Sequence, residues 1–121
     1  NKYSIRLMKT LINFLLAFIA RLSISFLGAA LFVIGLILSS KKSKYLLNVA
    51  ISYDQLGNVL GGPLFNLILK KQGGRPFGDS DETISYVLGK NKRINKLTRL
   101  GTWIADGLNK IDPNHVEKAK S

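Results

Sequence analysis

The part of this sequence that could do chemistry is a set of acidic and polar side chains with one histidine. Asp54 and Asn58 are four residues apart, which places them on one face of a helix. An acidic pair and the single histidine complete the set: Asp81, Glu82 and His115. Such groups can ligate a hard cation, or serve a hydrolase as acid, base and orienting group. Their spacing matches no HExxH, GxSxG, Walker or EF-hand signature, so it names neither a metal nor a reaction.

Each of these residues also has a structural interpretation. Asp81 is placed to cap a short helix from Glu82 to Leu88, with Gly89 ending it. Asp54 and Asn58 are placed to bond backbone groups where a helix meets a loop, and a lone histidine is commonly structural. These interpretations weigh more than the catalytic one. We therefore expect a protein that is not an enzyme and that needs no cofactor.

The first element that the apolar pattern predicts is a membrane helix. Leu22 to Ser40 reads LSISFLGAALFVIGLILSS, a run of 19 residues without a charged side chain. A helix of this length is roughly 28 Å long, close to the bilayer's hydrocarbon thickness of about 30 Å. A chain of 121 residues can hardly cover such a helix on all sides. We therefore expect a transmembrane helix at about 22–40.

A second apolar stretch, residues 3–20, precedes this helix and follows a basic start. It resembles the charged and apolar parts of a signal peptide, and we expect it to be uncleaved because another apolar run follows at once. Either it forms an amphipathic helix at the interface, or residues 10–40 form a hairpin or one long tilted helix. A charge at the centre of a membrane helix costs about 2.5 to 3.5 kcal/mol on insertion scales. We therefore place Arg21 among the headgroups and favour one crossing, within an anchoring region 1–43.

The charge is positive and unevenly distributed. The formal net charge is +11, no acidic residue precedes Asp54, and residues 54–121 carry all seven acidic residues with eleven of the basic ones. Anionic headgroups attract such residues by about 1 kcal/mol each. Nucleic acid is a second candidate partner, because phosphates attract the same charges. The lysines border apolar runs, so we expect headgroup contacts at Arg21, Lys41, Lys42 and Lys44, with the lysine end on the cytoplasmic side.

Residues 44–121 are predicted to form a small domain of short helices, which makes the whole chain all-α. A helix at 45–60 should end at Gly61-Gly62-Pro63, and residues 72–81 have the composition of a loop. Residues 91–111 place apolar side chains at helical spacing, with basic residues opposite. The apolar face of this amphipathic helix would complete its burial on the membrane or on a partner. Asp112-Pro113 should begin a last short helix that carries His115.

Three ordered motifs in residues 44–119 carry a resemblance to a known group of proteins. They are KYLLNVAISYDQLGNVLGG at 44–62, DETIS at 81–85 followed by LGK at 88–90, and IDPNHVEKA at 111–119. In this combination the chain resembles a family of small proteins encoded by tailed phages and prophages, for which no activity is established. The resemblance implies a phage origin and a shared set of polar residues: Asp54, Gln55, Asn58, Asp81, Glu82, Thr83, Ser85 and His115.

These observations predict a phage-encoded integral membrane protein with a structural or partner-binding role. Its place would be a virion membrane or the bacterial inner membrane, and its partners would be anionic lipids and other phage or membrane proteins, a second copy included. One alternative is a membrane-tethered hydrolase or metal-binding protein that uses Asp54, Asn58, Asp81, Glu82 and His115. Another is a membrane-linked protein that binds DNA during packaging or ejection.

Overall fold

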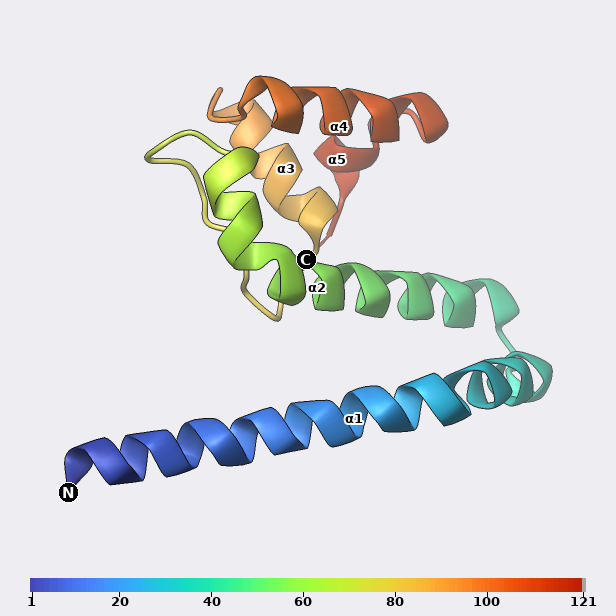
Figure 1. Cartoon of the computed structure of the whole chain (residues 1–121). Coiled ribbons are helices and arrows are strands. Elements are labelled where there is room, and N and C mark those ends of the chain that lie inside the picture. The colour runs from blue at the N-terminus through green and yellow to red at the C-terminus, as the bar shows by residue number, and fades with distance from the viewer. Residues whose placement is uncertain (121) are drawn as a thin grey trace. The chain divides into compact units, whose positions relative to one another are not determined.

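The computed structural model describes residues 1–120, and this part of the chain is helical without a β-strand. It divides into two compact units, residues 1–46 and residues 47–121. The boundary predicted from sequence lies between residues 43 and 44. The all-α class and the long apolar helix followed by shorter helices are confirmed (Figure 1).

The first unit consists of α1 (Lys2–Leu38) and the start of α2 (Lys42–Ile68). α1 is one uninterrupted helix of 37 residues, roughly 55 Å long at the usual helical rise. It has no break at Arg21, so residues 3–20 do not form a separate helix. The reason is local. The segment contains no proline, and helix-forming residues continue without interruption on both sides of Arg21. No residue of α1 is buried.

α1 ends where two later groups satisfy its last carbonyls. The Ser39 N–H donates to the Gly35 carbonyl, and Lys42 Nζ donates to the carbonyls of Leu36, Ile37 and Ser39 at 2.8, 3.2 and 3.0 Å. A cation at this end of a helix also complements the helix dipole. Tyr45, in the first turns of α2, stacks on Phe32, and its hydroxyl donates to the Phe32 carbonyl at 3.4 Å.

α2 continues through the glycine and proline residues that were expected to end it. Pro63 lies inside the helix, which extends to Ile68, so the predicted stop at Gly61-Gly62-Pro63 is wrong. Figure 1 shows the ribbon of α2 bending in its green part, as expected where a proline removes one hydrogen bond and crowds the preceding turn. Gly62 has a packing role instead. A Cβ atom there would lie 2.7 Å from the Gly78 Cα, so the loop after α2 rests on the bare helix backbone.

The three remaining helices begin and end at other residues than the sequence pattern indicated. α3 (Ile84–Arg93) is capped by Thr83, whose hydroxyl accepts from the Tyr86 N–H, so the predicted cap at Asp81 is wrong. α4 (Arg99–Ile111) is capped by Thr98, so residues 91–111 are not one helix. α5 (His115–Lys118) follows Asn114 in a left-handed conformation, while Asp112 ends α4 and does not begin α5.

The core of the second unit lies between α3, α4, α5 and the end of α2. α5 contacts both α3 and α4, as seen in Figure 1. Asn66 holds the loop after α2 by a reciprocal pair of hydrogen bonds with the Phe77 backbone, at 2.7 and 3.1 Å. The buried apolar residues are Leu69, Phe77, Val87, Leu88, Leu97, Ala105 and Val116.

Candidate functional site

Four side chains from four parts of the second unit form one hydrogen-bonded row. Ser85, near the start of α3, is the centre of the row, and its Oγ donates to Asp54 Oδ2 in α2 at 3.0 Å. The same Oγ lies 3.1 Å from His115 Nε2 in α5. His115 Nδ1 lies 3.1 Å from Oδ2 of Asp112, at the end of α4. The row therefore connects every helix of this unit through side chains.

Counting protons in the row gives two hydrogen-bonded states. If the Ser85 hydroxyl donates to Asp54, then Nε2–H of His115 must donate to Ser85. Since Nδ1 faces the Asp112 carboxylate, His115 is then an imidazolium that donates to Asp112 and to Ser85. If His115 is neutral with its proton on Nδ1, the Ser85 hydroxyl donates to Nε2 instead. The second state has the connectivity of a Ser-His-Asp hydrolase.

The burial of Ser85 determines whether a substrate could reach the row. Ser85 is 5% exposed, so an incoming carbonyl group cannot reach its hydroxyl without movement of a neighbouring helix. Asp54 is also engaged on its other oxygen, where Oδ1 accepts from the Ile84 N–H at 2.7 Å. A carboxylate at a helix N-terminus complements the helix dipole. In this geometry the hydrogen bonds of the row hold α2, α3 and α5 together.

Asn58 is fully buried and bonds backbone groups of the loop before α3. Its Nδ2 donates to the carbonyls of Asp79 and Glu82, at 2.9 Å each, and its Oδ1 accepts from the Gly78 N–H at 3.2 Å. Neighbouring Gln55 donates to the Asp81 carbonyl at 3.4 Å. The two amides therefore shape the loop and do not face the Ser85 row.

The acidic pair of the sequence motif is split between two surroundings. Glu82 is buried and pairs with Arg75, whose Nε donates to both carboxylate oxygens at 3.1 Å. The hydrogen bond to Glu82 raises the pKa of Arg75 above its ordinary value. Asp81 is exposed, and its backbone N–H donates a hydrogen bond to Asp79 Oδ1. Thr83 caps α3, and its hydroxyl donates to the Lys120 carbonyl at 3.2 Å.

The structure therefore brings together two of the predicted candidates, Asp54 and His115, and adds Ser85 from the polar motif. Asp112 completes the row but was missed as a site residue. Its position three residues before His115 is the signal that could have found it. Among residues 1–120, no group of three His, Cys, Asp or Glu side chains could hold a metal ion.

Ion pairs hold α5 from both sides. Asp112 accepts from Lys118 at 2.9 Å as well as from His115, and these hydrogen bonds lower the pKa of Asp112 below its ordinary value. Glu117 pairs with Lys92 of α3, and this hydrogen bond lowers the pKa of Glu117. The amide of Asn109 in α4 also donates to both Glu117 oxygens, at 3.0 and 3.1 Å.

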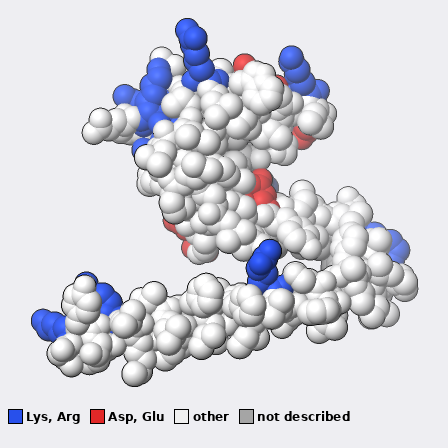
Figure 2. Space-filling model, viewed as in Figure 1, with Lys and Arg blue, Asp and Glu red and all other residues white. Residues whose placement is uncertain are grey.

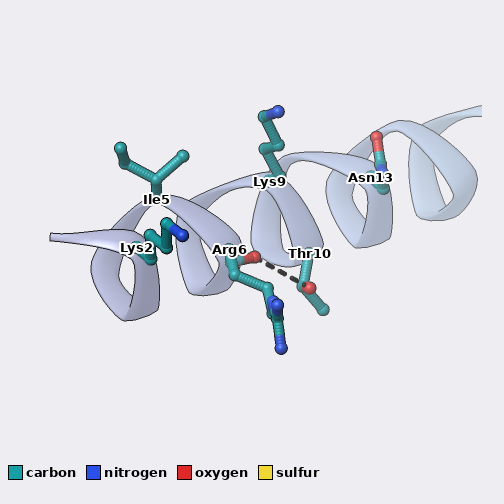
Figure 3. Close-up of a pocket in the computed structure, with 6 residues that line it drawn as sticks. All are labelled: Lys2, Ile5, Arg6, Lys9, Thr10 and Asn13. Atoms are coloured by element: carbon teal, nitrogen blue, oxygen red, sulfur yellow. Dashed lines mark hydrogen bonds between the residues drawn. The ribbon is translucent and has the colours of Figure 1, made fainter.

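The residues predicted to contact headgroups lie at exposed positions in the first unit. Arg21, Lys41 and Lys44 are exposed, whereas Lys42 uses its ammonium group to cap α1. A shallow hollow on the first turns of α1 adds further basic residues (Figure 3). Its lining consists of Lys2, Ile5, Arg6, Lys9, Thr10 and Asn13.

Comparisons of the chain with protein-family models, curated proteins and solved structures gave no match.

Proposed function

We propose that this chain is a small membrane-anchored protein whose helical unit binds protein partners. The observation that carries the proposal is α1, which is long and apolar enough to cross a membrane and has none of its residues buried. An apolar helix that its own chain leaves bare needs another apolar surrounding, and the bilayer core supplies one. The segment from Leu22 to Leu38 is about 26 Å long, which is close to the hydrocarbon thickness of about 30 Å, and Arg21 lies at one end of it.

The positions of the basic residues support the same arrangement. Arg21 lies before this segment, and Lys41, Lys42 and Lys44 follow it, so both ends would meet headgroups. Lys42 is already held at the end of α1, which fixes one positive charge at that level. The resemblance of residues 44–119 to proteins of tailed phages and prophages supports a bacterial inner membrane or a virion membrane as the site of this anchor. The partners would be other phage or membrane proteins, or a second copy.

Fractionation of the full chain beside a chain that starts at Lys44 tests the anchor. Membranes are washed with high salt and then with carbonate, and an N-terminal tag reports whether α1 is retained. We expect the tagged full chain to resist both washes and the shorter chain to be released. Loss of the tag would make α1 a cleaved signal sequence. Release of both chains by salt would contradict the membrane anchor and would favour a complex with nucleic acid or with another protein.

One observation favours a hydrolase as a second candidate function. The row of Ser85, His115 and Asp112 has the order and spacing of a nucleophile, a base and an orienting carboxylate. It would need α5 to move, because Ser85 is buried. A fluorophosphonate probe tests the assignment. Labelling that is lost in Ser85→Ala and kept in Ser80→Ala would support Ser85 as a nucleophile. Absence of labelling would contradict the hydrolase and would mean that the row has a structural role.

A further inference from the structure

The outer face of α4 is an apolar stripe that the rest of the second unit does not cover. Leu100, Trp103 and Ile111 lie on it and are 43%, 73% and 84% exposed, with exposed Gly107 between them. Their spacing of three or four residues aligns them along one side of the helix. Gly101 and Ala105 are buried on the opposite side. We call this stripe the α4 outer face.

α4 cannot turn to bury this face, because contacts at both ends fix its rotation. At its start, the Thr98 hydroxyl donates to the Ile68 carbonyl at 2.7 Å, and the Thr98 N–H donates to the Leu69 carbonyl at 3.0 Å. A Cβ atom on Gly101 would overlap the Leu69 carbonyl, so the helix packs directly on backbone there. Near its end, Asn109 Oδ1 accepts from the Val116 N–H at 3.0 Å. The exposed stripe is therefore built into the fold.

Positive charge lies along one edge of the α4 outer face. Arg99 and Lys110 are on that edge with Asp106, the acidic residue of α4, and Lys96 lies just before the helix. Figure 2 shows Lys and Arg side chains projecting from the part of the unit that carries α4. Within residues 1–120 the ion pairs use the cations Arg75, Lys92, His115 and Lys118. The charges of Lys96, Arg99 and Lys110 are thus free to meet an outside partner.

We propose that the α4 outer face lies in the headgroup region of a bilayer that contains anionic lipid. Tryptophan is favoured at this depth, aliphatic side chains enter the acyl boundary, and flanking arginine and lysine meet phosphates. The inference rests on the proposed function in one respect. A chain anchored by α1 keeps α4 at a high effective concentration near the membrane, so weak surface binding suffices.

Trp103 is the chain's single tryptophan, so its fluorescence reports on this face alone. The full chain is reconstituted into phosphatidylcholine vesicles with or without phosphatidylglycerol. With the anionic lipid we expect a blue-shifted emission, protection from acrylamide, and quenching by brominated acyl chains. Emission that stays red-shifted and fully quenched by acrylamide in both vesicles would overturn the proposal. A blue shift that follows the protein-to-lipid ratio would assign the face to a second copy and would overturn it too.

Charge variants test the electrostatic part. Removing one basic residue that contacts the surface should weaken surface binding about fivefold, which is the 1 kcal/mol per residue expected for anionic membranes. Arg99→Gln with Lys110→Gln should therefore restore much of the acrylamide quenching. The matched control, Lys90→Gln with Lys120→Gln, removes the same charge from α3 and the C-terminal segment and should leave the emission shift intact. Equal effects of the two pairs would contradict a specific face.

Flotation after a carbonate wash separates this proposal from the anchor. Carbonate-resistant flotation with an exposed Trp103 would support α1 and overturn the assignment of α4. Salt-sensitive flotation with Trp103 quenched by brominated lipid would support α4 and overturn the anchor. Absence of flotation in both kinds of vesicle would overturn both. Far-UV circular dichroism of each variant in detergent confirms that the second unit is folded.

Discussion

Asn58 is one of the buried residues that hold the loop between α2 and α3. Asn58→Ala would leave the Asp79 and Glu82 carbonyls and the Gly78 N–H without partners in a buried place. We expect a loss of about 2 to 4 kcal/mol. For a unit of this size this lowers the unfolding midpoint by roughly 10 to 30 °C in a thermal melt in detergent. Asn48→Ala, at an exposed position of the same helix, is the control and should change little.

The carboxylates that hold α5 make its attachment dependent on pH. Hydrogen bonds to cations lower the folded-state pKa of both Asp112 and Glu117. Their contribution is therefore fully present above the ordinary carboxyl range, about pH 4, and is lost as pH falls through the lower folded values. A titration of the Val116 amide chemical shift should show α5 loosening in that acidic window. A Glu117→Gln variant should already be loosened at neutral pH. An unchanged Val116 signal down to acid unfolding would contradict this role.

Single residues of the polar cluster could be found from sequence, but their grouping could not. Asp54 stands out because an acidic residue is uncommon within an apolar helix. His115 stands out because it is the chain's single histidine. Ser85 joins them because the fold places it between Asp54 and His115, a tertiary arrangement without a local signal, whereas Asp112 has a local signal because it lies three residues before His115. Arg75, which pairs with Glu82, lies in a glycine-rich loop whose path no periodicity describes.

At the scale of the helices, α5 packs against bare backbone in α3. A Cβ atom on Gly89 would overlap the Val116 carbonyl oxygen, which belongs to backbone and cannot rotate away. We expect Gly89→Ala to displace α5 and destabilise the unit, although alanine is the better helix former by about 1 kcal/mol. Gly107→Ala is the matched control, because nothing lies within 4 Å of its Cβ. It should stabilise α4 by about 0.5 to 1 kcal/mol. Thermal melts that shifted in the same direction for both variants would contradict this packing.

The helix boundaries show where local patterns are sufficient. The pattern finds helices in the regions of α1, α2 and α4, because apolar residues recur there at helical spacing. It misplaces the end of α2, since Pro63 is tolerated within a helix whose following turns are held by Asn66 and the core. It also misplaces two N-caps, because Thr83 and Thr98 compete with nearby residues of equal capping ability, and tertiary contacts choose between them.

At the scale of the whole chain, α1 is longer than one crossing requires. Its roughly 55 Å exceed the hydrocarbon core of about 30 Å, and Arg21 lies near its middle. Placing Arg21 among headgroups leaves residues 22–38 in the hydrocarbon and residues 2–20 beyond it. The sequence left open whether the two apolar stretches form one helix or two. Because they form one straight helix, both cannot lie inside one bilayer unless the charge of Arg21 is buried there.

Thiol labelling in oriented membrane vesicles tests this arrangement, because the chain has no cysteine and each variant carries a single thiol. We expect Leu31→Cys to be protected from a water-soluble maleimide, since it lies midway along residues 22–40. Ser4→Cys and Ser43→Cys should react from opposite sides, with Ser43 on the cytoplasmic side because Lys41, Lys42 and Lys44 surround it. Reaction of both from one side would mean that α1 lies along the surface. Reaction from opposite sides with Ser43 outside would keep the crossing and reverse its orientation, so each result assigns α1 one placement.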